Sequence, residues 1–178
     1  KIQLLYSMLF TLPGTPVLYY GDQIGMGDNI NLPDRNGVRT PMQWDDSLNG
    51  GFSTAPPDKL YSPVIDDPVY GYHKVNVAAQ RRDPDSLLST IRHMVHTFKA
   101  QPALADGKLF WIEDAPMNTV VFWRESAEQV LLAFHNLANA PMSVTTARFA
   151  GRSVTDVLSD EQYVLDAAVD LSAYGYKW

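Results

Sequence analysis

The loop between residues 34 and 44 carries the side chains best suited to bind a ligand. It reads Asp-Arg-Asn-Gly-Val-Arg-Thr-Pro-Met-Gln-Trp and brings Asp34, Arg35 and Arg39 into one polar segment. A guanidinium presents planar, forked donors to hydroxyl groups or carboxylates, and a carboxylate accepts hydrogen bonds from hydroxyl groups. We therefore take Arg39, Arg35 and Asp34 as candidate binding residues for a hydroxyl-rich ligand.

A structural role stays open for each of these side chains. Arg39 could pair with Asp45 or Asp46 and merely hold its own loop. Asp34 and Arg35 could be a solvated turn pair, which contributes little to stability. Four aromatic residues could stack on a ring or anchor the fold, namely Tyr20, Trp44, Phe52 and Tyr61.

Metal and cofactor motifs are sparse. His93 and His96 have an i, i+3 spacing that a metal site could use, but no third ligand is apparent. The chain has neither a glycine-rich phosphate loop nor a Gly-x-Ser-x-Gly nucleophile motif. We expect no metal and no cofactor.

The first seventy residues predict one helix and strand followed by a long loop. Apolar residues at helical spacing over 3–12 predict a largely buried helix, which Pro13-Gly14 ends. The apolar run 16–20 is typical of a strand covered on both faces in a parallel sheet. Residues 21–70 lack periodicity, but their aromatic residues favour an ordered loop of the kind that forms active sites.

A second helix is predicted after Asp83-Pro84, with Asp83 as the N-cap and an apolar stripe from Leu87 to Phe98. Gln101-Pro102 ends it, and a shorter helical piece is expected over 75–80. After Ala103 the pattern becomes β, with strands predicted over 109–112, 119–124, 129–135, 142–146, 153–157, 163–165, 168–171 and 176–178. Turn signals every 8 to 12 residues or so indicate a small antiparallel sandwich without an evident aromatic stripe.

Composition limits the class of protein. A chain of 178 residues that is 46% hydrophobic can bury a sizeable core, and its net charge of −6 disfavours nucleic acid and anionic membrane partners. The longest near-apolar run, 4–12, falls far short of the roughly 20 residues that span a bilayer. The absence of cysteine is compatible with a reducing compartment, and we expect a cytoplasmic protein.

The run Gly-Thr-Pro-Val-Leu-Tyr-Tyr-Gly-Asp from Gly14, with the later Arg-Thr-Pro-Met-Gln-Trp, resembles the last barrel strand and following loop of the α-amylase superfamily. Within it, the segment from Gly27 to Trp44 is most similar to the trehalose synthases, which are maltose glucosyltransferases. Residues 76–88 resemble the final barrel helix, and 171–178 resemble the last strand of the β-domain that follows. One departure is Gln23, where the family usually has glutamate.

The resemblance implies a fold and an activity. Residues 1–102 would be the C-terminal part of a (β/α)8 TIM barrel with its active-site loop, and residues 103–178 an antiparallel β-sandwich domain. The parent enzyme would isomerise maltose to trehalose by intramolecular glucosyl transfer through a retaining double displacement. Arg39, Arg35 and Asp34 would be substrate-binding residues that help retain the released glucose.

No catalytic residue is expected in this chain. Retaining chemistry needs two carboxyl groups about 5 to 5.5 Å apart across the sugar. Arg81-Arg82-Asp83 has the family's arginine–aspartate spacing but lies at a polar helix entry, and the Asn-His-Asp run of the family is absent. We therefore expect a C-terminal portion of a longer enzyme, inactive alone, with the carboxylates upstream.

Two other functions stay open. One is a hydrolytic α-glucosidase similar to the oligo-1,6-glucosidases, and the other is a non-catalytic module that binds glycan or packs against a partner. The expected partners are maltose, trehalose or glucose and the N-terminal part of the barrel. Nucleic acid and membrane partners are not expected, and an oligomer is possible.

Overall fold

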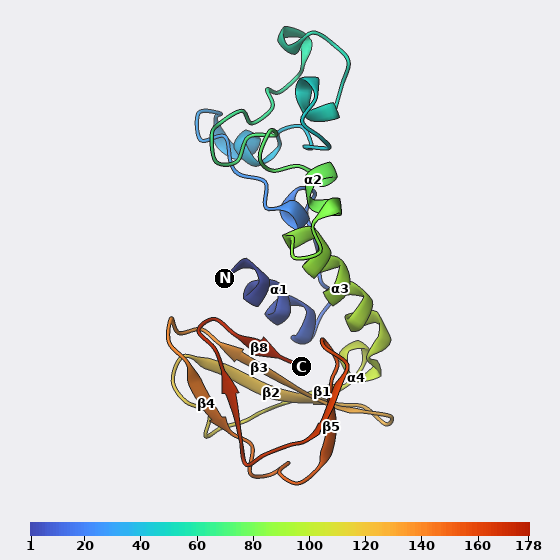
Figure 1. The fold of residues 1–178 in the computed structure, drawn as a ribbon, viewed down its shortest axis with the longest axis vertical. Helices are drawn as coiled ribbons and strands as arrows, with labels where there is room; N and C mark the ends of the chain where they lie inside the picture. The colour runs from blue at the N-terminus through green and yellow to red at the C-terminus, as the bar shows by residue number, and fades with distance from the viewer. The chain divides into compact units, whose positions relative to one another are not determined.

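The computed structural model describes residues 1–178 and divides into two compact units (Figure 1). The first unit comprises residues 1–16 and 93–178, and the second comprises residues 17–92. The sequence boundary expected between 102 and 103 therefore lies inside the first unit. The α-helices of the chain are α1 (Ile2–Thr11), α2 (Val77–Arg82), α3 (Leu87–Ala100) and α4 (Pro102–Ala105).

Eight strands follow the last helix, where the alternating pattern predicts them. They are β1 (Lys108–Trp111), β2 (Thr119–Glu125), β3 (Val130–Asn136), β4 (Met142–Thr145), β5 (Ser153–Asp156), β6 (Glu161–Val164), β7 (Ala168–Leu171) and β8 (Tyr176–Lys177). Every pairing is antiparallel, in the order β1-β2-β3-β8 with separate pairs β4-β7 and β5-β6. The predicted antiparallel β-sandwich is confirmed.

The core of the sandwich lies on one face of the four-stranded sheet. Val121 and Trp123 of β2 and Phe134 of β3 point to this face, and Val144 of β4 and Val169 of β7 pack against them. Val121 and Phe134 are register partners, so the two strands present apolar side chains to the same layer. Alternation with a period of two residues produces this burial.

The opposite face of the same sheet packs against helices. There the guanidinium of Arg124 is 3% exposed and donates to three main-chain carbonyls. Its Nε lies 2.9 Å from the Gly107 oxygen, Nη1 3.0 Å from the Thr11 oxygen and Nη2 3.3 Å from the Leu104 oxygen. Thr11 ends α1 and Leu104 lies in α4, so one cation satisfies carbonyls at the negative ends of both helices.

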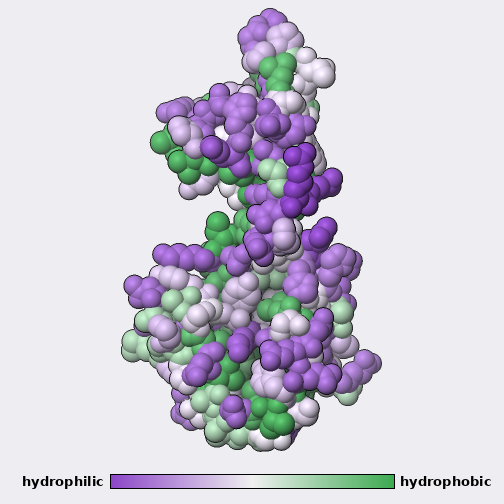
Figure 2. All heavy atoms as spheres, viewed as in Figure 1, coloured by the Kyte–Doolittle hydropathy of each residue, from purple (hydrophilic) through white to green (hydrophobic).

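Helix α1 buries only one face. Leu4 and Phe10 are almost inaccessible, whereas Leu5 is 64% exposed and Ile2 is half exposed. The prediction of a largely buried helix is therefore wrong, because none of the described residues covers its other face. Green apolar atoms also interrupt the hydrophilic surface in Figure 2.

Residues 16–20 do not form the predicted strand. They lie outside every sheet, and Val17 is 79% exposed. A parallel strand needs neighbouring strands to pair with its backbone and to cover its side chains. None of the described residues supplies such a neighbouring strand, so the apolar run joins no sheet.

The N-cap of α3 differs from the predicted one. The helix begins at Leu87, and the hydroxyl of Ser86 accepts the Ser89 N–H at 3.2 Å. Asp83 instead ends α2, and its carboxylate accepts the Asp85 N–H at 2.9 Å. Both residues are good cap types, and the local turn at Asp83 shifts the start of the helix by one turn.

The helices in this structure are all too short or too polar to cross a membrane.

Candidate functional site

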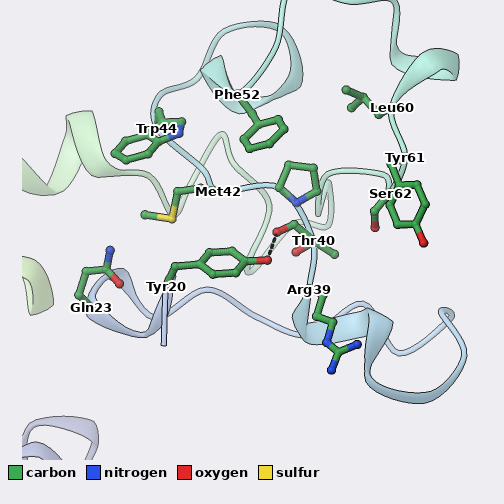
Figure 3. Close-up of a pocket in the computed structure, with 11 residues that line it drawn as sticks. Tyr20, Gln23, Arg39, Thr40, Met42, Trp44, Phe52, Leu60, Tyr61 and Ser62 are labelled. Atoms are coloured by element: carbon green, nitrogen blue, oxygen red, sulfur yellow. Dashed lines mark hydrogen bonds between the residues drawn. The ribbon is translucent and has the colours of Figure 1, made fainter. Parts of the chain in front are cut away.

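The second unit contains a cavity of about 450 Å³ formed by its loops. Four short 3-10 helices shape these loops: η1 (Asp22–Ile24), η2 (Asp34–Val38), η3 (Leu48–Gly51) and η4 (Pro57–Lys59). The volume lies in the range of small-molecule sites. The lining residues are Tyr20, Gln23, Arg39, Thr40, Pro41, Met42, Trp44, Phe52, Leu60, Tyr61 and Ser62 (Figure 3).

Buried amide contacts hold the wall of this cavity in place. Gln43 is fully buried, and its Nε2 donates to the carbonyls of Val75 and Tyr70, the latter at 3.0 Å. The Val77 N–H in turn donates to the Gln43 carbonyl at 3.0 Å. The segment from Arg39 to Trp44 is thus tied to the start of α2, which positions its neighbours along the cavity.

Arg39 lies on the cavity wall. It follows directly after η2, and its guanidinium points away from Phe52 and Trp44 in Figure 3. The structure contains no ion pair between Arg39 and Asp45 or Asp46. Asp45 accepts hydrogen bonds from the backbone and hydroxyl groups of Ser47 instead, and these bonds hold the pKa of its carboxyl below the usual value. The Arg39 donors therefore have no protein acceptor.

Asp34 and Arg35 occupy the first turn of η2, four or five residues before Arg39. Both side chains are exposed, and neither lines the cavity or takes part in an ion pair. Asp34 has a φ of 51°, a left-handed conformation that aspartate tolerates better than most residues. Gly37 permits this tight turn, since a Cβ there would lie 2.7 Å from the Asn29 carbonyl oxygen.

Tyr20 connects two sides of the cavity. Its hydroxyl donates to the Thr40 carbonyl at 2.9 Å, as the dashed line in Figure 3 shows. Burial raises the pKa of the Tyr20 phenol, Tyr19 acts in the same direction, and the positive charge of Arg39 opposes them. The phenol stays protonated at neutral pH and serves as a donor.

Two buried hydroxyl groups on the cavity wall have no partner. They are Oγ1 of Thr40, a residue that is 1% exposed, and Oγ of Ser62. A buried polar group without a hydrogen bond costs about 1 to 3 kcal/mol. Such groups at a cavity are suited to bond a polar ligand that enters it.

All four aromatic candidates line the cavity. Trp44 is 48% and Phe52 51% exposed, so their rings have open faces, and Tyr20 and Tyr61 are exposed too. Gln23 also lines it, and its Oε1 accepts the Gly21 N–H at 2.9 Å. A glutamate could accept the same bond, so this backbone contact does not require the family's usual residue.

The structure adds residues that the sequence did not single out. Thr40 adjoins Arg39 in the loop, so its position in the sequence could have indicated it. Ser62 lies in a stretch with no motif, and only the folding of the loop after η4 brings it to the cavity. The lining includes no aspartate or glutamate, so this part of the site offers binding groups without a carboxylate pair.

Comparison with known sequences extends this description. The family described as "Alpha amylase, catalytic domain" matches residues 1–107, and "Maltogenic Amylase, C-terminal domain" matches residues 110–178. The class is that of barrel enzymes whose catalytic domain is followed by a β-domain. This chain belongs to the alpha-amylase family.

Several curated relatives are trehalose synthases. The chain is 40% identical to "Trehalose synthase" of Pimelobacter sp. (strain R48) over 188 residues, which cover 100% of this chain and 33% of the relative. It is 54% identical to that of Thermus thermophilus, over 78% of this chain and 14% of the relative. It is 45% identical to "Trehalose synthase/amylase TreS" of Mycobacterium tuberculosis (strain ATCC 25618 / H37Rv), over 81% of this chain and 24% of the relative. The chain thus spans a third or less of these relatives, and the predicted resemblance to trehalose synthases is confirmed.

Solved structures show the same fold. The trehalulose synthase MutB from Pseudomonas mesoacidophila MX-45 superposes with a TM-score of 0.79 at 23% identity, covering 99% of this chain and 37% of that chain. The isomaltulose synthase PalI from Klebsiella sp. LX3 superposes with a TM-score of 0.75 at 20% identity, covering 99% of this chain and 37% of that chain. The predicted fold class, the end of a (β/α)8 barrel followed by a β-domain, is confirmed.

Proposed function

We propose that the protein carrying this chain isomerises maltose to trehalose by intramolecular glucosyl transfer. Its similarity to trehalose synthases, at 40% identity across the whole chain, supports this reaction. The observation that carries the proposal for this part of the enzyme is the cavity, whose lining combines Arg39, with its unpaired side-chain donors, and exposed aromatic residues. Aromatic faces stack on the apolar side of a pyranose, and a guanidinium donates to its hydroxyls.

The reaction is a retaining double displacement. A carboxylate attacks the anomeric carbon of the non-reducing glucose, and the bond to the leaving oxygen breaks as a second carboxyl group gives that oxygen a proton. The released glucose then turns and attacks the same carbon through its anomeric hydroxyl, which loses its proton to the second carboxylate, while the ester bond to the first carboxylate breaks and frees it. We place both carboxylates in the part of the barrel outside this chain, and the cavity lining contributes neither aspartate nor glutamate.

Arg39, Arg35 and Asp34 act as substrate-binding residues in this scheme. Arg39 holds a hydroxyl of the released glucose, while Asp34 and Arg35 cover the entrance from the exposed turn of η2. Exclusion of water is essential, since water that reaches the glucosyl intermediate yields hydrolysis. The substrates are maltose, trehalose and glucose, and we place the enzyme in the cytoplasm, consistent with the absence of cysteine from these 178 residues.

The test uses the whole enzyme with Arg39→Ala, and Arg81→Ala on the exposed surface of α2 as the matched control. With maltose as substrate, we expect the ratio of glucose to trehalose to rise by about tenfold in Arg39→Ala, as expected for loss of a charge-assisted hydrogen bond. Arg81→Ala should keep the parent ratio. An unchanged product ratio in Arg39→Ala would remove the retention role, and the absence of trehalose from the parent enzyme would overturn the proposed reaction.

Hydrolysis is the second candidate function. The Mycobacterium tuberculosis relative is named a trehalose synthase/amylase, and the open side of the cavity could admit water. A parent enzyme that releases free glucose from maltose as its main product would favour an α-glucosidase.

A further inference from the structure

A second groove, of about 680 Å³, lies in the first unit on the β-sandwich. It runs between β1, an edge strand of the four-stranded sheet, and the residues that follow β4. It shares no lining residue with the cavity of the second unit. The lining residues are Leu109, Phe110, Trp111, Ile112, Glu113, Asp114, Trp123, Thr145, Thr146, Ala147, Arg148 and Phe149.

Stacked aromatic rings form the floor of this groove. Phe110 and Trp123 are register partners on β1 and β2, and their rings stack with centroids 5.1 Å apart. Phe149 meets the other edge of Trp123 at 5.4 Å. Trp123 and Phe149 are buried, whereas Phe110 is 39% exposed and lines the groove.

Charged groups surround this floor without pairing to one another. The Arg148 guanidinium lies 4.5 Å from the centroid of the Trp123 ring and is exposed. Glu113 and Asp114 are exposed and follow the C-terminal end of β1. No ion pair joins either of them to Arg148. Their side chains form no hydrogen bond within the protein. The groove lining therefore combines unpaired donors and acceptors with aromatic rings.

We propose that this groove binds an α-glucan chain, such as a maltooligosaccharide or glycogen. A pyranose has an apolar face for Phe110 and hydroxyls that both donate to Glu113 or Asp114 and accept from Arg148. An anion would meet two carboxylates and a cation would meet Arg148, so a neutral polyhydroxy ligand suits the charges best. The choice of α-linked glucose rests on the proposed function, whereas the presence of a sugar groove rests on the residues themselves.

The test is retardation of the whole protein in native gels that contain glycogen, with titration by maltoheptaose to measure affinity. We expect the parent to be retarded, and Phe110→Ala or Arg148→Ala to weaken maltoheptaose binding by up to about tenfold. Met117→Ala, an exposed apolar residue outside the groove, and Arg92→Ala, an exposed guanidinium on α3 outside the groove, are matched controls that should bind like the parent.

The exposed pair Glu113→Gln with Asp114→Asn tests the groove even if Phe110→Ala does not fold, because it changes no packed side chain. We expect it to weaken binding as well. No retardation of the parent, or equal affinity in all groove variants, would overturn the proposal, and equal binding of cellohexaose would overturn the α-glucan assignment. Trehalose formation from maltose is measured separately, so a failure of the groove and a failure of the proposed function are distinguishable.

Discussion

The imidazole Nε2 of His135 lies 3.0 Å from the hydroxyl of Ser7, and so joins strand β3 to helix α1 across 128 residues of sequence. The other ring nitrogen, Nδ1, lies 3.1 Å from the Val120 carbonyl, which can only accept. Nδ1 therefore carries the proton, and Nε2 accepts from Ser7. The Ser7 oxygen accepts in turn from the indole Nε1 of Trp178 at 2.7 Å. One polar chain thus fixes the helix, the sheet and residue 178.

Replacement of His135 by alanine should destabilise the first unit. His135 is fully buried, so His135→Ala leaves a cavity and takes partners from Ser7 and from the Val120 carbonyl. We expect a loss of about 3 kcal/mol in the free energy of unfolding, measured by urea denaturation. His96→Ala, on the exposed side of α3, should change it by less than about 0.5 kcal/mol. Equal stability of the two variants would contradict a structural role for the His135 chain of bonds.

The same histidine should lower the free energy of unfolding as the pH falls. Burial lowers the pKa of His135 from 6.5 to about 4, because the cation would lose its hydration. Between those values the unfolded state binds more protons than the folded state, so acid favours unfolding. The contribution is fully present above the unfolded pKa and is lost as pH falls to about 4, by roughly 3 kcal/mol.

The measurement for this prediction compares the parent with His135→Gln at several pH values from 7 to 4. Glutamine cannot titrate, so the variant should lose less stability than the parent over that range. Carboxylates titrate in both proteins and cancel in the comparison. Parallel stability curves would show that His135 is not the acid-sensitive group.

Arg124 should be essential to the packing of helices on the sheet. Arg124→Met keeps much of the side-chain length but leaves the Gly107, Thr11 and Leu104 carbonyls without their donor. We expect a loss of about 3 kcal/mol on unfolding in urea. Arg124→Lys should recover only part of it, because an ammonium lacks the planar fork. Full stability of Arg124→Met would mean that the three carbonyls find other partners.

The unpaired hydroxyl of Thr40 predicts opposite effects on stability and binding. Thr40→Val removes a buried group without a partner at nearly constant volume, so we expect an increase of about 1 kcal/mol in the free energy of unfolding. In the whole enzyme the KM for maltose should rise, because a sugar hydroxyl loses its partner. Thr40→Ser is the control variant, because it keeps the hydroxyl group. Lower stability with an unchanged KM would assign the Thr40 hydroxyl to the fold.

The β-sandwich could be predicted almost in full from the sequence. Apolar and polar residues alternate along short strands that are separated by turns, and this pattern involves only near neighbours in the sequence. The bounds of β2 and β3 therefore lie within one or two residues of the predicted ones. The sequence also indicated the site loop, since Arg39, Trp44 and Phe52 all line the cavity. Prediction from the sequence fails where the position of a residue depends on partners far along the chain.

Sequence alone determined the class of structure and the polar loop of this protein, because residue type and spacing act over a few neighbours. Only the tertiary structure decided the features that depend on contacts between residues far apart in the sequence. It left residues 16–20 without a sheet and brought Ser62 to the cavity. It also stacked Phe110 on Trp123, which lie on different strands and therefore form no stripe in the sequence. Burial, hydrogen-bond partners and register belong to the folded chain, since each depends on atoms that the sequence separates.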